Sequence, residues 1–185
     1  NGHVVRLQLP HNKLYGQLPE ELPDLPCLEV IDLRHNELQG PVPVWLPRLS
    51  SLREVRLGNN ALCGPIPSWL AHMDRLRVLN LEHNELSGPI PPGLARLSAR
   101  LRDLRLNGNR LTGPIPRQLR SLRQIAVLDL GNNQLVGEIP QELGELTSLR
   151  NLNLSANLLE GRIPAYIGHL TLLRNLDLGN NHLTG

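Results

Sequence analysis

The sequence predicts an α/β solenoid made of 24-residue coils, and two observations carry that prediction. The first is a fixed period: one asparagine recurs every 24 residues, with a single interval of 25, at Asn12, Asn36, Asn60, Asn84, Asn109, Asn133, Asn157 and Asn181. The second is the leucine pattern around each asparagine, in which LxxLxLxxN is followed by LxGxIP. Because alternating apolar and polar residues are typical of a strand, each LxL segment predicts a short strand with its leucines inward. One coil cannot bury this leucine face alone, so stacked coils must share a core and place their strands in one parallel sheet.

The coils follow one another with small departures from this pattern. The first, residues 3–24, ends in a proline-rich turn, and the second and third carry Trp45 and Trp69 at equivalent positions. The fourth has one residue more than its neighbours at 97–101, which predicts a tolerated bulge in a convex connection. The fifth is strongly basic, and the last three lie closest to the ideal pattern. We expect one domain over residues 1–185, with seven full coils and the start of an eighth.

Three residue types mark the turns of every coil. A buried carboxamide offers donors and an acceptor to backbone groups that lose their sheet partners at a turn, so the repeated asparagines predict a structural ladder. The repeated glycines predict a backbone angle that other residues resist: Gly16, Gly40, Gly64, Gly88, Gly113, Gly137 and Gly161. The prolines three residues later fix φ where the chain leaves the strand side.

The combination of LxxLxLxxN with LxGxIP resembles the plant-type leucine-rich repeat of receptor-like kinases, receptor-like proteins and polygalacturonase-inhibiting proteins, over the whole chain. The resemblance implies a right-handed superhelix with a concave parallel sheet. It also implies a second short strand near LxGxIP and 3-10 turns on the convex side. For function, it implies recognition rather than catalysis.

Composition and the chain ends add further expectations. No apolar run approaches the ~20 residues of a membrane span, so we expect no direct membrane insertion in this segment. The first residues resemble the repeat that follows the family's N-terminal cap, and the last repeat is incomplete, so we expect a fragment without caps. Cys27 and Cys63 fall at opposite strand ends, which predicts two free thiols.

Outward-pointing strand residues predict a polar recognition surface on the concave face. Neighbouring coils lie roughly 4.8 Å apart, so residues at one repeat position form ladders. The central ladder mixes charges of both signs and lacks aromatic residues, which predicts a low-relief surface. Its candidate ligand-binding residues are Asp32, Arg56, Asn80, Arg105 and Asp129.

A basic lateral patch is the second candidate site. Arg53, Arg77 and Arg102 share one position at the strand entrance, with Arg75 and Arg100 beside them. Such a patch fits an anionic partner such as an acidic peptide, sulfate or uronate, and the alternative is an edge of solvated charges. Nucleic acid is disfavoured as a partner, because the sequence has no aromatic residue between coils three and seven to stack a base.

Trp45 and Trp69 form a candidate convex contact. The equivalent positions of other coils hold residues as different as glycine and glutamate, which suggests that the core does not need this position filled. We therefore expect both indoles to stay exposed as one joined apolar surface for a partner. The alternative is that they pack over their coils as lids.

Three further motifs were weighed for chemistry. Asn153 begins the sequence's N-x-S/T sequon and is a candidate glycosylation site on the concave strand of coil seven. His11, His35 and His83 share one repeat position, but no third ligand is fixed by spacing, so we expect no metal site and no cofactor. The sequence lacks G-x-S-x-G, H-E-x-x-H, C-x-x-C and GK[ST], which argues against an enzyme.

The predicted function is non-enzymatic recognition of a protein or peptide ligand, possibly acidic, most like a plant-type leucine-rich-repeat receptor ectodomain. This places the protein outside the cell or at its surface. Two alternatives stay open. One is a secreted enzyme inhibitor resembling the polygalacturonase-inhibiting proteins. The other is a structural subunit of a larger, intracellular assembly.

Overall fold

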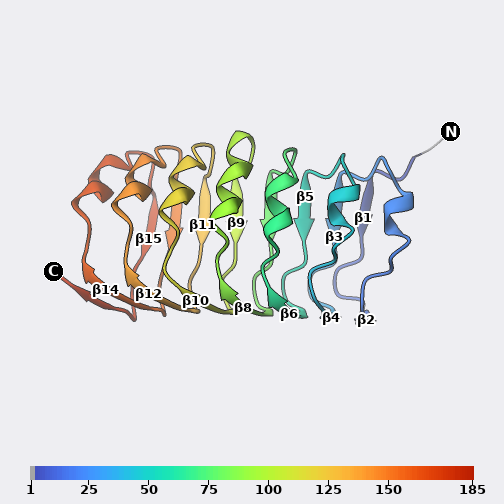
Figure 1. The fold of residues 1–185 in the computed structure, drawn as a ribbon, viewed down its shortest axis with the longest axis horizontal. Coiled ribbons are helices and arrows are strands. Elements are labelled where there is room, and N and C mark those ends of the chain that lie inside the picture. Colours follow the sequence, from blue (N-terminus) through green and yellow to red (C-terminus); the bar gives the residue numbers. More distant parts are fainter. Residues whose placement is uncertain (1–2) are drawn as a thin grey trace.

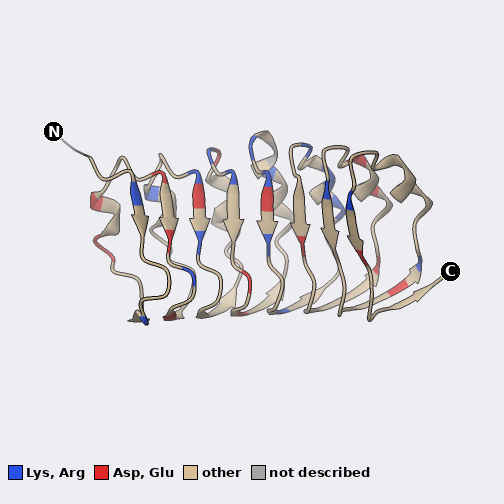
Figure 2. Cartoon of the chain, turned by 180° about the vertical axis from the view of Figure 1, so that it is seen from behind, with Lys and Arg blue, Asp and Glu red and all other residues tan. Residues whose placement is uncertain are grey.

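The structure is a computed structural model that describes residues 3–185, and these residues form a single stack of coils. The coils follow one another along the long axis, from the blue N-terminal coil to the red C-terminal coil (Figure 1). Three-residue strands occupy one face of the stack, and 3-10 helices occupy the opposite face (Figures 1 and 2). We call these the strand face and the helix face.

The strand face is a parallel sheet built from the LxL segments. Its strands are β1 (Arg6–Gln8), β3 (Val30–Asp32), β5 (Glu54–Arg56), β7 (Val78–Asn80), β9 (Asp103–Arg105), β11 (Val127–Asp129), β13 (Asn151–Asn153) and β15 (Asn175–Asp177). They lie side by side in chain order. Equivalent repeat positions are paired throughout, so that Asn80 lies opposite Arg56 on one side and Arg105 on the other. This confirms the predicted sheet and the predicted register of its ladders.

A second parallel sheet runs along the lower edge of the solenoid in Figure 1. Its strands are β2 (Tyr15–Gly16), β4 (Glu37–Gly40), β6 (Ala61–Pro65), β8 (Glu85–Pro89), β10 (Arg110–Gly113), β12 (Gln134–Glu138), β14 (Leu158–Arg162) and β16 (His182–Thr184). The repeated glycines lie here with φ between +75° and +84°, a region that residues with a Cβ resist. The predicted second strand and the predicted glycine conformation are both confirmed.

The helix face consists of one 3-10 helix per coil. These helices are η1 (Leu22–Asp24), η2 (Leu46–Arg48), η3 (Ser68–His72), η4 (Pro92–Ala99), η5 (Arg117–Ser121), η6 (Gln141–Glu145) and η7 (Ala165–His169). A proline precedes most of them, and its fixed φ sets the direction in which the chain turns away from the second sheet. The extra residue of coil four lengthens η4 to 8 residues, against 5 in η3 and η5, so the predicted bulge is absorbed by the helix.

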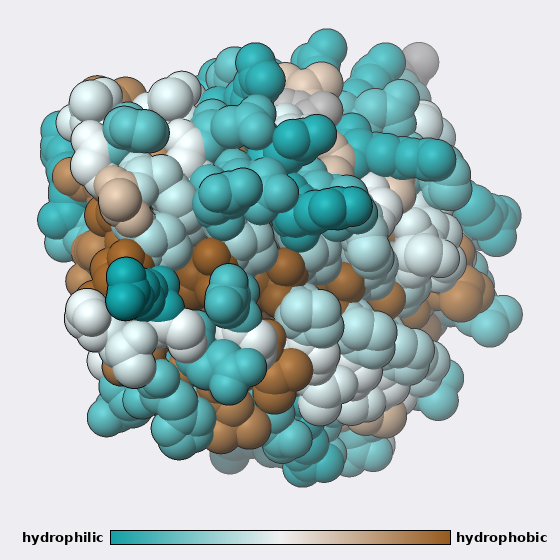
Figure 3. Space-filling model, turned by 60° about the vertical axis from the view of Figure 1, so that its left-hand side comes forward, coloured by the Kyte–Doolittle hydropathy of each residue, from teal (hydrophilic) through white to brown (hydrophobic). Residues whose placement is uncertain are grey.

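The core between the two faces is a column of leucine and isoleucine. Central members such as Leu104 and Leu128 are 0% exposed, whereas Leu176, at the same repeat position in the last coil, is 41% exposed. Hydrophobic residues are visible at the C-terminal end of the stack when that end is turned forward (Figure 3). Burial is therefore complete in the middle coils and partial at the ends.

The asparagine ladder ties each coil to the one before it. Asn84 Oδ1 accepts a hydrogen bond from the Leu62 N–H at 2.9 Å. Asn84 Nδ2 donates to the carbonyl oxygens of Leu57 and Leu81, each at 3.1 Å. The same pattern recurs from Asn36 to Asn181. The ladder is confirmed, except that Asn12 is exposed and its side-chain amide donates only to the Pro10 carbonyl.

The prediction that both tryptophans stay exposed is wrong. Trp45 is only 6% exposed and belongs to the core, and Trp69 is half-buried against it. The ring at this position leans back over the preceding coil, where Trp45 borders a small hollow with Gln17 and Leu18. The equivalent Tyr166 does the same, since a Cβ on Gly144 would lie 2.8 Å from its ring. The rings are lids on neighbouring coils.

Candidate functional site

The central ladder of the strand face has the predicted register but not the predicted exposure. Arg56, Arg105 and Asp129 are half-buried. Asp32 and Asn80 are only 5% and 4% exposed, so the predicted exposure of these two side chains is wrong. The physical reason is that longer side chains two residues later fold over them, as the following pairs show. Their role as ligand contacts stays a prediction.

Most strand-face arginines are paired within their own coil. Arg34 Nη2 lies 2.7 Å from Asp32 Oδ2, and its hydrogen bond holds the pKa of Asp32 below the ordinary value. The same arrangement recurs in Arg56–Glu54 at 2.9 Å and in Arg105–Asp103 at 3.0 Å. Residues two apart on a strand share one face, so the sequence spacing D-x-R and E-x-R was the signal for these pairs. The candidate residues predicted from the sequence included Asp32, Arg56 and Arg105 but not their partners Arg34, Glu54 and Asp103.

Two polar residues of the ladder are held differently. The Asn80 amide Nδ2 donates to Glu82 Oε1 at 2.9 Å, and its Oδ1 accepts from the Glu82 N–H at 3.1 Å. Asp129 accepts a hydrogen bond from the Gly131 N–H at 3.2 Å and forms no ion pair with any residue in the described range. Burial raises the pKa of Asp129, against the opposing effects of Gly131 and Arg105. Asp129 is therefore a half-buried carboxylate of the strand face that no ion pair within residues 3–185 neutralises.

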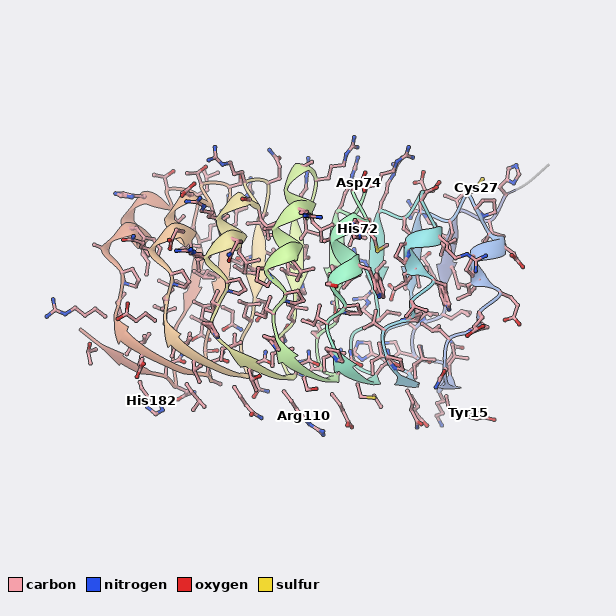
Figure 4. All side chains as sticks on the ribbon, in the orientation of Figure 1. Tyr15, Cys27, His72, Asp74, Arg110 and His182 are labelled. Carbon is pink, nitrogen blue, oxygen red and sulfur yellow. The ribbon has the colours of Figure 1, made fainter. Side chains whose placement is uncertain are left out.

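The basic lateral patch is only partly assembled. Arg77, Arg100 and Arg102 line one hollow of about 340 Å³. Arg53 instead pairs with Glu29 at 3.2 Å. Arg75 lines a separate hollow of about 260 Å³ that also includes His72 and Asp74. Figure 4 shows Asp74 at the upper edge of the solenoid, above His72.

The column that contains Arg77 and Arg102 is longer than predicted. The Arg102 N–H donates to the Arg77 carbonyl at 2.9 Å, which places the two residues on successive rungs. Beyond Ala126 the same column continues to Arg150 and Arg174, each joined to the preceding rung by a hydrogen bond of 2.8 Å. The repeat period would have found both arginines. Figure 2 shows the resulting basic residues at the upper ends of the strands.

The remaining candidates stay separate from one another. Asn153 lies on β13, where its Oδ1 accepts from the Ser155 hydroxyl at 2.7 Å. His11 and His35 stack with ring centroids 4.2 Å apart, but no cluster of three metal-ligating side chains occurs within residues 3–185. Cys27 and Cys63 are both free thiols, as predicted, one near the upper edge and one on β6 of the lower sheet (Figure 4).

A shallow depression of about 520 Å³ lies over β13 and β15 on the strand face. Its polar lining comes from Asn151, Asn153, Arg174, Asn175 and Asp177. The exposed Asn175 and Asp177 border this depression together with the half-buried Asn151 and Asn153. No helix within residues 3–185 combines the length and apolar character that crossing a membrane requires.

Stacked parallel strands, a buried asparagine ladder and 3-10 turns define a leucine-rich-repeat solenoid. The sequence profile of the Leucine rich repeat family matches residues 28–86, 50–111 and 99–159. These matches together span more than half of the chain, and the chain belongs to the leucine-rich repeat family. Among curated protein sequences, none matches the chain.

Solved structures of plant receptors resemble the chain closely. One is the leucine-rich-repeat ectodomain of the plant membrane receptor kinase GASSHO1/SCHENGEN3 from Arabidopsis thaliana, in complex with CASPARIAN STRIP INTEGRITY FACTOR 2. It is 40% identical to this chain, with a TM-score of 0.92, and the match covers 96% of this chain and 21% of that chain. The Arabidopsis receptor kinase HAESA, in complex with the peptide hormone IDA and the co-receptor SERK1, is 37% identical with a TM-score of 0.91 over 96% of this chain and 30% of that chain.

A third match is the plant peptide hormone receptor RGFR1 in complex with RGF2, which is 28% identical with a TM-score of 0.83. It covers 96% of this chain and 32% of that chain. This chain thus spans about a fifth to a third of the length of the receptor structures it resembles.

Proposed function

We propose that this chain is a non-enzymatic recognition module of a plant-type leucine-rich-repeat receptor, and that it binds an extended peptide along the strand face. The observation that carries the proposal is the strand face itself. It is an unbroken parallel sheet of eight strands, with polar ladders running at right angles to them. The resemblance to receptor ectodomains in complex with peptide hormones supports the same assignment.

The mechanism follows from how rigidly the face is built. Ion pairs within the second, third and fifth coils, such as Arg56–Glu54, fix these side chains before any ligand arrives. A preorganised surface loses less conformational entropy on binding than a mobile one, so several shallow polar contacts can add up to a specific complex. Asp129 offers an acceptor, and Arg56 and Arg105 offer donors, to the backbone and side chains of a peptide.

Selection from a random peptide library against the 185-residue chain tests the proposal. We expect selected peptides to lose about tenfold or more in affinity when Arg56 and Arg105 are both changed to alanine. The matched control changes Arg96 and Arg117, two exposed arginines of the helix face, and should leave affinity within about threefold. Peptides that depend on the helix-face pair instead would overturn the proposal.

The alternative of an assembly subunit loses part of its support. It was based on open coil ends and on two exposed convex tryptophans, and Trp45 is buried in the core. An enzyme inhibitor would use the same strand face against a protein surface. If selected short peptides bind and their affinity depends on strand-face residues, the result favours the receptor module over such an inhibitor.

We also infer that the chain lies outside the cell or at its surface, and that Asn153 carries a glycan there. Asn153 borders the depression over β13 and β15, so a glycan would cover that end of the strand face and direct a peptide toward the earlier coils. The intact mass of the chain secreted from plant cells should exceed that of the Asn153→Gln variant by one glycan. Equal masses would exclude the modification.

A further inference from the structure

Arginines of the strand face and arginines at the upper edge of its sheet differ in what they contact. Arg34, Arg56 and Arg105 of the strand face each pair with a carboxylate of their own coil. At the upper edge of the same sheet, Arg77, Arg100 and Arg102 are exposed, and none of them forms an ion pair with a residue of the described range 3–185. The positive charges of these three edge arginines are therefore not neutralised by a neighbouring carboxylate.

The three edge arginines surround one hollow of about 340 Å³, with Ala99 and Gln124 completing its lining. Arg77 and Arg102 stand on adjacent rungs of the sheet, roughly 4.8 Å apart along the backbone. Positive groups held this close repel one another unless a negative group lies between them. A guanidinium presents a planar fork of donors that matches a carboxylate, and the Gln124 amide adds a neutral donor beside it.

We propose that this hollow binds the carboxylates of an acidic segment of an extended peptide, and that the arginine column carries the site onward along the sheet. The inference rests on the proposed function, because it specifies the chemistry of the same peptide ligand. Arg150 and Arg174 extend the column past Ala126. The distance from Arg77 to Arg174 is four rungs, roughly 19 Å, which about six residues of extended peptide span.

The length of the arginine column favours a peptide over a single free anion as the ligand. One oxyanion can engage the arginines of the hollow only. Carboxylates joined in one chain engage successive arginines, and each contact after the first occurs at high effective concentration. The arginine column lies at the upper ends of the strands that form the strand face (Figure 2). One bound peptide can therefore contact both the column and the strand face.

Isothermal titration of the 185-residue chain with decaglutamate tests the inference, with decaglutamine and inorganic sulfate as comparison ligands. We expect decaglutamate to bind at about 50 mM salt and to weaken at about 150 mM. The variant Arg77→Gln/Arg102→Gln should bind it at least about tenfold more weakly. The control Arg117→Gln/Arg162→Gln removes the same charge from two exposed arginines elsewhere and should change affinity less than about threefold.

Both double variants change exposed side chains, so their melting temperatures should stay close to that of the parent chain, and lost binding will not reflect lost folding. Equal weakening by the two variants would overturn the inference, because it would show attraction to net charge alone. An affinity for decaglutamate no higher than for sulfate would also overturn it. If the chain binds library peptides on the strand face but does not bind decaglutamate, this inference is wrong and the proposed function stands. If it binds decaglutamate but no library peptide on the strand face, the proposed function is wrong.

Discussion

At the residue scale, two aspartates of the same ladder experience opposite environments. Asp32 is covered by Arg34, and that hydrogen bond lowers its pKa from the ordinary 3.8. Asp129 is half-buried without an ion-pair partner in the described residues, and burial raises its pKa. At the same repeat position, the fold thus stabilises the ionised form of Asp32 and destabilises the ionised form of Asp129.

These directions give opposite effects of pH. Asp32, whose folded pKa is lowered, contributes stability above pH 3.8 that is lost as the pH falls through its folded pKa. Asp129, whose folded pKa is raised, favours folding below pH 3.8, and this contribution is lost as the pH rises through its folded pKa.

We therefore predict that Asp32→Asn lowers the free energy of unfolding at pH 7 by about 1–2 kcal/mol, because Arg34 is left without its carboxylate but is partly solvated. Asp129→Asn should instead raise it by roughly 0.5 kcal/mol. The difference for Asp129→Asn should shrink as the pH falls through its raised folded pKa toward 3.8, whereas the difference for Asp32→Asn should shrink only below pH 3.8. Urea unfolding at pH 3 to 7 measures them. Two substitutions with the same sign at pH 7 would refute the assignment.

At the element scale, the 3-10 helices explain why the tryptophans were misjudged. The helix-face position that holds Trp45 and Trp69 accepts residues as different as Gly93 and Glu142, which suggested a solvent position. Each short helix turns this side chain back over the preceding coil, where a large ring is covered and a small residue leaves a shallow surface. This position tolerates many residue types because it lies at the edge of the core, where a small residue leaves no cavity. The tolerance does not mean that every side chain at this position is exposed.

We predict that Trp45→Ala costs about 3–5 kcal/mol of unfolding free energy, as for a buried aromatic residue. Trp69→Ala should cost about half as much, because its ring is only half-buried. Single-tryptophan variants check the exposure directly. Iodide should quench Trp69 fluorescence in Trp45→Phe and should have little effect on Trp45 in Trp69→Phe, and similar quenching in both would contradict the lid geometry.

At the scale of the whole molecule, stability depends on contacts between successive coils. Most of the buried hydrogen bonds of the ladder join a residue to one about 22 to 28 positions away. A coil in the middle of the stack is therefore held from both sides, and a coil at either end of the described stack is held from one side. The contrast in leucine burial between Leu104 and Leu176 has the same origin.

The ladder gives a matched test of this view. Asn84→Ala leaves the buried Leu62 N–H without its partner. It also removes one of the two ladder hydrogen bonds that each of the Leu57 and Leu81 carbonyl oxygens accepts, and should cost about 2–4 kcal/mol, of which about 1–3 kcal/mol comes from the unsatisfied N–H. Asn12→Ala removes one exposed hydrogen bond at the same repeat position and should cost less than about 1 kcal/mol. Urea unfolding compares the two, and equal losses would show that the ladder does not bind coils together.

The sequence by itself determined everything that the repeat period controls. The 24-residue spacing identified the strands, the register of the ladders, the hydrogen-bonding asparagines and the glycines with positive φ. These features depend on a residue's position along its own coil, and that position can be counted. The same count would have extended the arginine column to Arg150 and Arg174.

Only the tertiary structure decided which side chains are covered and which charges are paired. Asp32, Asn80 and Trp45 occupy positions that looked exposed, yet longer neighbours or the preceding coil bury them. Within residues 3–185, Arg77, Arg100 and Arg102 form no ion pair, and this likewise depends on which side chains lie beside them in space. Burial and pairing arise from side-chain length and from contacts across coils, and a position within the repeat fixes neither of them.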